Sequence, residues 1–160
     1  IPALWEANME VLDPEHSGIN LFDENWKIFS RNSGLTGHRI GEDATVEESM
    51  ITDGCNIQGT VKHSVLFSGV TVEKGAIVED AVVMGHSRIR EGAVVRHCII
   101  AENVEIEAGA QVGEKLKRGG GGDVATIASN VTIGAGVAIP ADAMIYEDVY
   151  TMEEKEDEDQ

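Results

Sequence analysis

The densest group of basic side chains in this acidic chain comprises Arg88, Arg90, Arg96 and His97. Positive charge gathered on an acidic background is typical of a site that binds an anion. The same side chains could instead pair with carboxylates of neighbouring segments, for which the candidates are Glu91, Glu102 and Glu105. Of these two interpretations, ion pairing is the favoured one.

The histidines and cysteines are the other side chains that could carry chemistry. The five histidines are His16, His38, His63, His86 and His97. None has a second ligand at the spacing of a zinc motif, so we expect no metal site. His86 or His97 could act as the general base of an acyl transfer, although a surface position on a repeat is the favoured interpretation of each. Cys98 lies among apolar neighbours and is predicted to fill the core. We therefore predict no catalytic residue.

A run of four glycines lies in the segment Lys115–Asp123, KLKRGGGGD. A phosphate-binding loop of the Walker type needs Gly-Lys-Ser/Thr at the start of a helix, and that sequence does not follow Gly122. The segment is therefore predicted to be a flexible loop. An anion site formed by Lys115, Lys117 and Arg118 is the alternative.

The composition excludes several classes of partner. The chain has 160 residues, with 12 basic and 29 acidic side chains and a formal net charge of −17. Nucleic acid and anionic membranes attract basic surfaces, so we expect neither as a partner. The chain has no apolar run of about 20 residues, no signal peptide pattern and only two cysteines, which together predict a cytoplasmic protein. It begins with Ile1 rather than Met, so we expect a piece of a longer protein.

A period of six residues dominates the sequence from Ile40 onward. Its clearest run is Ile127, Ile133, Ile139 and Ile145. An aliphatic residue at the first position and a small one at the fifth predict an all-β fold, a left-handed parallel β-helix of hexapeptide repeats. Each repeat of six residues would form one face of the β-helix, so three repeats would give a coil of about 18 residues. We expect about five coils. The register slips by one residue between Met84 and Ile89 and is poor between Ile51 and Val70.

The N-terminal segment differs from the repeats. Leu4, Trp5, Asn8, Met9 and Leu12 recur at helical spacing, and Asp13-Pro14 is expected to stop the helix. An extended arm is predicted to follow. We thus divide the chain into a connecting helix and arm (1–38), a β-helix domain (39–150, with a loop insertion at 114–125) and a disordered acidic tail (151–160).

Four segments carry a resemblance to a known family. They are Leu4–Leu12 (LWEANMEVL), Asn20–Phe29 (NLFDENWKIF), Gly54–Ile57 (GCNI) and Ser64–Val72 (SVLFSGVTV). They resemble the domain junction and first coils of bacterial glucose-1-phosphate adenylyltransferases, also called ADP-glucose pyrophosphorylases. The resemblance implies an enzyme that joins ATP and glucose 1-phosphate, with Mg²⁺, into ADP-glucose for glycogen synthesis. It places the nucleotide loop and metal-binding aspartates upstream of Ile1, so it implies an inactive C-terminal fragment with no cofactor of its own.

The same resemblance implies a regulatory and oligomerisation role. The fragment would pack on its own catalytic domain and on other subunits of a homotetramer or hetero-oligomer, and help bind a small-molecule allosteric effector. Arg96 and His97 match a basic pair in relatives and are the first candidates for effector binding, and Arg31 is the second. Because aromatic residues are concentrated in the connector, we further expect Trp5, Trp26 and the junction helix to transmit effector occupancy to the catalytic domain. Some relatives end in a basic helical extension that this chain replaces with more repeats and an acidic tail, which argues against sugar-phosphate activation.

Three alternatives stay open at this point. The chain could belong to a non-catalytic paralogue subunit, whose distinguishing residues would lie upstream. It could be a hexapeptide-repeat acyltransferase that uses acetyl-coenzyme A. It could also belong to a related sugar nucleotidyltransferase with another base or sugar.

Overall fold

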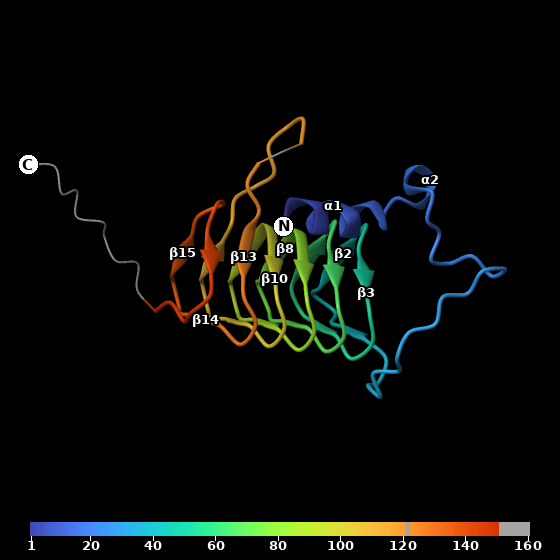
Figure 1. The fold of residues 1–160 in the computed structure, drawn as a ribbon. Coiled ribbons are helices and arrows are strands. Elements are labelled where there is room, and N and C mark those ends of the chain that lie inside the picture. Colours follow the sequence, from blue (N-terminus) through green and yellow to red (C-terminus); the bar gives the residue numbers. More distant parts are fainter. Residues whose placement is uncertain (121, 151–160) are drawn as a thin grey trace, which may run out of the picture.

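The computed structural model describes residues 1–120 and 122–150. The predicted acidic tail, 151–160, lies outside these residues. Stacked coils form the body of the molecule, with a helix along one side and an arm at the first coils (Figure 1). The predicted parallel β-helix of hexapeptide repeats, with its N-terminal helix and arm, is confirmed. None of the described helices is long and apolar enough to cross a membrane.

The coils have three faces, which we call A, B and C, and all strand pairs are parallel. Face A is formed by β1 (Arg39–Ile40), β4 (Asn56–Ile57), β7 (Thr71–Val72), β9 (Arg88–Ile89), β11 (Glu105–Ile106) and β14 (Thr132–Ile133). Face B contains β2 (Thr45–Glu47), β5 (Thr60–Lys62), β12 (Gln111–Val112) and β15 (Ala138–Ile139). Face C contains β3 (Met50–Ile51), β6 (Val65–Leu66), β13 (Ala125–Ile127) and β16 (Met144–Ile145). The longer strands β8 (Ile77–Val83) and β10 (Val94–Ile100) turn the corner between faces B and C and belong to both.

The coils in the middle of the stack are shorter than the roughly 18 residues expected from the repeat. One turn of the stack separates Ser49 from Ser64 by 15 residues, and His63 from Asp80 by 17 residues. The coil between β10 and β13 is much longer, because it includes the glycine-rich loop. The last coil on face C, between β13 and β16, has the expected length. The shortened coils explain the register slips in the sequence, since one corner loses residues while the strands stay aligned.

The interior of the stack is filled mainly by aliphatic side chains. Val61, Val78 and Val95 are fully buried on face B, as are Leu66 and Val83 on face C. A narrow interior of this kind accepts branched aliphatic residues and leaves no room for rings. The thiol of Cys98 is completely buried among them, which confirms its predicted place in the core.

A second apolar cluster lies on the outer surface of face C, under helix α1 (Pro2–Glu10). Met9 of the helix is 7% exposed and packs with Val65, Val82 and Ile99, which point outward from successive coils. Each of these residues is followed by an aliphatic residue that points into the stack. Face C is therefore buried on both sides, which is why its strands carry two apolar residues in succession. The helix ends before the predicted stop, and a short helix, α2 (Pro14–Ser17), begins at Pro14.

The segment from 18 to 38 contains no helix or strand and loops away from the coils before it reaches β1 (Figure 1). Its large apolar side chains face solvent: Trp26 is 70% exposed and Phe29 86%. The end of the arm is held at the first coil, where the amide of Gly54 donates to the carbonyl of Thr36 at 2.7 Å. The arm therefore presents apolar surface that no other described part of the chain covers.

Candidate functional site

The corner between faces B and C has an unusual backbone. Four stacked residues, Glu48, His63, Asp80 and His97, have φ values of 43°, 42°, 50° and 44°. Residues with a side chain rarely adopt this left-handed conformation, and such strain is found preferentially at functional sites. We call this column the B–C corner. It is the place where β8 and β10 pass from one face to the next.

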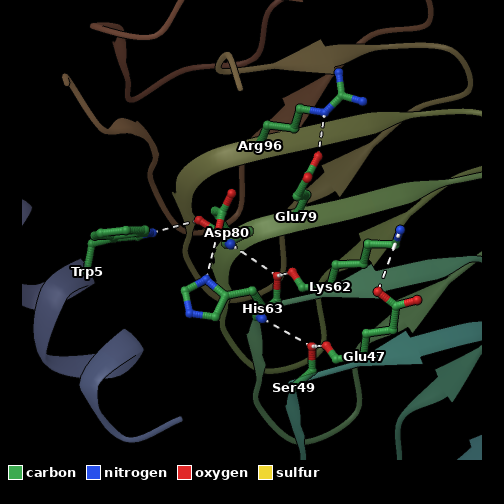
Figure 2. A network of polar contacts seen from close by, with 10 residues as sticks. Trp5, Glu47, Ser49, Lys62, His63, Glu79, Asp80 and Arg96 are labelled. Atoms are coloured by element: carbon green, nitrogen blue, oxygen red, sulfur yellow. Dashed lines mark hydrogen bonds and ion pairs between the residues drawn. The ribbon is translucent and has the colours of Figure 1, made fainter. Parts of the chain in front are cut away.

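Trp5 joins helix α1 to the B–C corner through two contacts. Its indole Nε1–H donates to the backbone carbonyl of Asp80 at 2.7 Å, as Figure 2 shows. Its ring stands edge-on to the imidazole of His97, with ring centroids 4.6 Å apart and an angle of 80° between the planes. The turned backbone of the corner exposes the Asp80 carbonyl to a partner outside the stack. The helix is thereby fixed to two consecutive coils.

The side chains of Asp80 and His63 are also joined at this corner. The Oδ1 atom of Asp80 lies 2.7 Å from Nδ1 of His63, one coil away (Figure 2). The Asp80 carboxylate is mostly buried, with 15% of its side chain exposed. Asp80 thus contacts the helix through its backbone and the preceding coil through its side chain, which makes it the central residue of the corner.

Arg96 lies beside the corner but belongs to a ladder of alternating charges on face B. Glu47, Lys62, Glu79 and Arg96 stack in one column along the strands. Lys62 pairs with Glu47 at 3.7 Å, and Arg96 Nε donates to Glu79 at 3.1 Å (Figure 2). Alternation avoids the repulsion that like charges in neighbouring strands produce. The guanidinium of Arg96 is therefore already engaged by a carboxylate.

The other two arginines of the basic group form ion pairs on face A. Arg88 pairs with Glu73 at 2.9 Å, and Arg90 pairs with Glu105. The favoured interpretation, ion pairing, thus holds for the three arginines of the group. Of the three expected acidic partners only Glu105 is used, because the shortened coils bring Glu73 and Glu79 beside Arg88 and Arg96 instead.

His97 is the member of the group that remains without an ion pair in the part of the chain that the structure describes. Its side chain is 5% exposed, and burial lowers the pKa of the imidazole, while the carboxylates of Asp80 and Asp123 act in the opposite direction without reversing the shift. The ring is therefore neutral at pH 7, with one nitrogen able to donate a hydrogen bond and the other able to accept one.

A small cavity lies between His97 and the two limbs of the glycine-rich loop, which projects from the coils as the orange segment in Figure 1. Its volume is about 110 Å³, and it is lined by His97, Glu114, Lys115, Lys117, Gly122, Asp123 and Ala141. We call it the loop cavity. Two separate predictions from the sequence meet here, since the loop lysines and His97 were candidates for anion binding on different grounds.

Arg31 lies at a different place. It lines a groove of about 510 Å³ between the end of the arm and the corner of the first coils, together with Asp53 and Ser68. An adjoining groove of about 560 Å³ contains Phe67, His86 and Glu102. Neither groove shares a lining residue with the loop cavity. The structure therefore separates Arg31 from Arg96 and His97, and the assignment of all three to an effector site stays a prediction.

The titratable side chains at these places can be described one by one. Burial raises the pKa of both Cys55 and Cys98, so neither thiol is an activated nucleophile. Within residues 1–120 and 122–150, no group of three His, Cys, Asp or Glu side chains is placed to hold a metal ion. His86 and His97, the candidate bases, lie in separate cavities and neither makes a hydrogen bond to a described carboxylate that would orient it.

Sequence reasoning missed the Trp5–Asp80–His63 contacts. The signal that could have indicated them is a repeated pair of polar residues, Lys62-His63, Glu79-Asp80 and Arg96-His97, at intervals of 17 residues. With the coil taken at this shorter length, these pairs fall on one corner. The partner on α1 could not be located in this way, because a helix lying outside the repeat has no register with it.

Comparisons with known proteins agree on the repeat region. A family model described as "GlmU-like, C-terminal hexapeptide" matches residues 35–122. Glucose-1-phosphate adenylyltransferase of Bacillus mycoides (strain KBAB4) is 49% identical over 109 residues, which cover 68% of this chain and 29% of that protein. The enzymes of Bacillus thuringiensis (strain Al Hakam) and Bacillus anthracis are 48% identical over the same length and share.

The matched region is the C-terminal part of these relatives, and it spans less than a third of their length. Among solved structures, the acetyltransferase domain of PglB from Neisseria gonorrhoeae FA1090 is 25% identical, with a TM-score of 0.35, covering 72% of this chain and 52% of that one. A score of that size does not establish a common overall fold.

Proposed function

Because the chain belongs to the GlmU-like family of C-terminal hexapeptide domains, and is homologous to the C-terminal region of glucose-1-phosphate adenylyltransferases, we propose that it is the regulatory and oligomerisation segment of such an enzyme. The parent enzyme makes ADP-glucose from ATP and glucose 1-phosphate for glycogen synthesis in the cytoplasm. The observation that carries this proposal is the identity of 48–49% over 109 residues, which is far above what a shared repeat pattern alone requires.

The catalytic chemistry belongs to the part of the parent enzyme that precedes this segment. Its Mg²⁺ would be held there, and it supplies charge neutralisation for the phosphates of ATP during nucleotidyl transfer. The segment itself is inactive. This part of the proposal is supported by coverage, since the chain spans 29% of the relatives' length.

The regulatory role is supported by the way the N-terminal helix joins the coils. Helix α1 is fixed to the B–C corner by Trp5, next to His97, and leads into an arm with exposed apolar side chains. An effector that binds at the corner would change the position of α1 and thereby the contacts of the arm. Regulation then follows from a difference in effector affinity between two positions of the helix.

The proposal is tested with the complete gene product that contains this segment. We expect it to release pyrophosphate from ATP and glucose 1-phosphate in the presence of Mg²⁺, while the 160-residue chain alone does not. Parallel assays with other nucleotides and sugar phosphates determine its specificity. Light scattering of the complete product would show a tetramer.

Three outcomes would contradict the proposal as stated. A complete product that is inactive alone but changes the activity of a partner subunit would be a non-catalytic paralogue. Preference for another nucleotide or sugar would indicate a related nucleotidyltransferase. Acetyl transfer from acetyl-coenzyme A that is lost on substitution of His86 or His97 would indicate an acyltransferase.

A further inference from the structure

Face B presents an outer surface made of two columns of side chains. The column beside the B–C corner is the ladder of alternating charges, whose four side chains lie on one side of the strands in Figure 2 and are 22–58% exposed. The other column precedes the core aliphatic residues of the same strands, and it consists of Thr45, Thr60, Ile77, Val94, Gln111 and Ala138. Helix α1 lies on face C, and face B is open to solvent, since Thr45, Gln111 and Ala138 are exposed.

The ladder is neutral in a strongly acidic chain. Its two carboxylates and two cations cancel, whereas the whole chain has a formal net charge of −17. Two copies of such a chain repel one another over most of their surfaces. At the centre of the neighbouring column, Ile77 and Val94 are only half-buried. Face B therefore offers a second copy a surface that is neutral and partly apolar.

The order of the charges makes the ladder complementary to itself. A two-fold axis that runs along the strands, midway between Lys62 and Glu79, reverses the direction of the stack. It sets Lys62 against the partner's Glu79. It likewise sets Glu47 against the partner's Arg96, so every contact joins opposite charges. A two-fold axis along the stack, or a slip of one coil, would set like charges against each other instead, which strongly disfavours these arrangements.

We propose that face B binds face B of a second copy of this chain, with the two stacks antiparallel about this axis. The contact is isologous, because the same patch is used on both copies. In the second column, Ile77 meets the partner's Thr60, and Val94 meets the partner's Thr45. The proposal deepens the oligomerisation part of the proposed function by naming the face, the partner and the register, and it rests on that function only for its place in the parent enzyme.

Face A does not have the same complementarity. One of its outer columns, Glu73, Arg90 and Glu107, also alternates in charge, but it contains three charges. A two-fold axis at Arg90 would set that guanidinium against the partner's Arg90. An axis on either side of it would leave one carboxylate without an opposite charge. The even number of charges on face B is what permits complete pairing.

The contact is small, which restricts its strength. Strands lie about 4.8 Å apart, so the four strands of the ladder extend over about 19 Å, and a strand of three residues is about 10 Å long. A patch of this size is well below the roughly 800 Å² per partner of a standard interface. The dimer of the isolated chain is therefore weak and depends on concentration. In an oligomer of the parent enzyme, other subunit contacts would raise the effective concentration of the two faces.

Exchange of charges tests the arrangement with the 160-residue protein. Lys62→Glu brings carboxylates together at both central contacts, and Glu79→Lys brings ammonium groups together there. By sedimentation at protein concentrations up to about 1 mM, each variant alone should dimerise at least tenfold more weakly than the unchanged chain. An equimolar mixture of the two pairs opposite charges at every contact, so its affinity should return to within about threefold of the unchanged chain. The two changes shift the net charge by equal amounts in opposite directions, so the mixed dimer has the total charge of the unchanged one.

Matched variants assign the association to face B. Lys74→Glu is the control, since it makes the same change of charge at a lysine that is 77% exposed and lies outside face B, and it should leave dimerisation unchanged. Thr60→Cys mixed with Ile77→Cys should form an intermolecular disulfide in air faster than either variant alone. The native thiols of Cys55 and Cys98 are buried and do not compete. Circular dichroism and the urea midpoint of each variant establish that it is folded.

Several results would overturn the proposal. They are a chain that stays monomeric at about 1 mM, undiminished association of Lys62→Glu, an equal loss in Lys74→Glu, and a mixture of the two charge variants that does not associate. Since these measurements use the isolated chain and need no catalysis, their failure is distinct from a failure of the proposed enzyme activity. A complete gene product that is tetrameric without this contact would associate through other surfaces.

Discussion

Replacing Trp5 should release helix α1 while leaving the coils intact. Trp5→Phe removes the hydrogen bond from Nε1 to the Asp80 carbonyl, whose length is 2.7 Å, but retains an aromatic ring against His97. A hydrogen bond of this kind contributes about 1 kcal/mol. Trp5→Ala also removes a half-buried ring and its edge-on contact. Since a fully buried tryptophan costs about 3–5 kcal/mol when cut to alanine, we expect a total of about 2–3 kcal/mol here.

Amide hydrogen exchange of the peptide covering α1 measures this release, because local opening is detected without unfolding the stack. A loss of about 1 kcal/mol speeds exchange in α1 roughly fivefold for Trp5→Phe, and about 2–3 kcal/mol speeds it roughly 30- to 160-fold for Trp5→Ala. The amides of β8 and β10 should keep their protection. Trp26→Ala is the matched control, since that side chain is 70% exposed and its loss should not alter exchange in α1.

Two results would refute the reasoning. Unchanged exchange of α1 in Trp5→Ala would mean that Met9 and its apolar neighbours alone hold the helix. Equal acceleration in α1 and β8 would mean that helix and coils open as one cooperative unit.

Three further predictions concern the same region and the stack. Because burial lowers the pKa of His97 below its ordinary value of about 6.5, the unfolded state binds the extra proton first. The free energy of unfolding should therefore fall as the pH drops from about 7 through about 6. Urea midpoints should show this decline, and a similar decline in His97→Gln would contradict it. Gly113→Ala should destabilise the fold by more than about 3 kcal/mol, since its Cβ would lie 2.0 Å from the Arg96 carbonyl oxygen. Gly92→Ala, at a similar φ and with nothing within 4 Å of its Cβ, should cost only about 1–2 kcal/mol. Comparable losses of the two variants in urea denaturation would argue against the clash. Arg96→Ala should cost no more than about 1 kcal/mol, because the pair with Glu79 is partly exposed; a larger shift of the urea midpoint would assign the arginine another role.

The stacked coils could be predicted from the sequence because each short repeat carries the same aliphatic residue that the interior requires. Every inward position must be a branched aliphatic residue, so Ile127, Ile133, Ile139 and Ile145 mark it without any reference to the rest of the chain. The length of the coil was harder to read, since a corner can lose a residue while both neighbouring strands keep their partners. The equal spacing of Thr60, Ile77 and Val94 becomes unambiguous only when the strands are seen paired.

The site was less predictable because it depends on contacts across long stretches of sequence. His97 and Lys115 were separate candidates, and only the path of the loop brings them to one cavity. The predicted effector residues are Arg31, Arg96 and His97, and the arm carries Arg31 to a groove of its own. The approach of Trp5 to Asp80 joins residues 75 positions apart, and nothing in either local sequence indicates the other.

The long coil that carries the glycine-rich loop shows that a coil of this architecture can be lengthened without disturbing the strand pairs that stabilise the stack. Strand β10 pairs with β13 directly across the insertion, so the added residues leave the strand partners of the stack undisturbed. Closing a longer loop costs only about 0.6 kcal/mol for each doubling of its length. A corner of the β-helix therefore tolerates insertions of varied sequence with little loss of stability. A recognition loop could be grafted at the same point, where the coils above and below would hold its two ends in fixed positions.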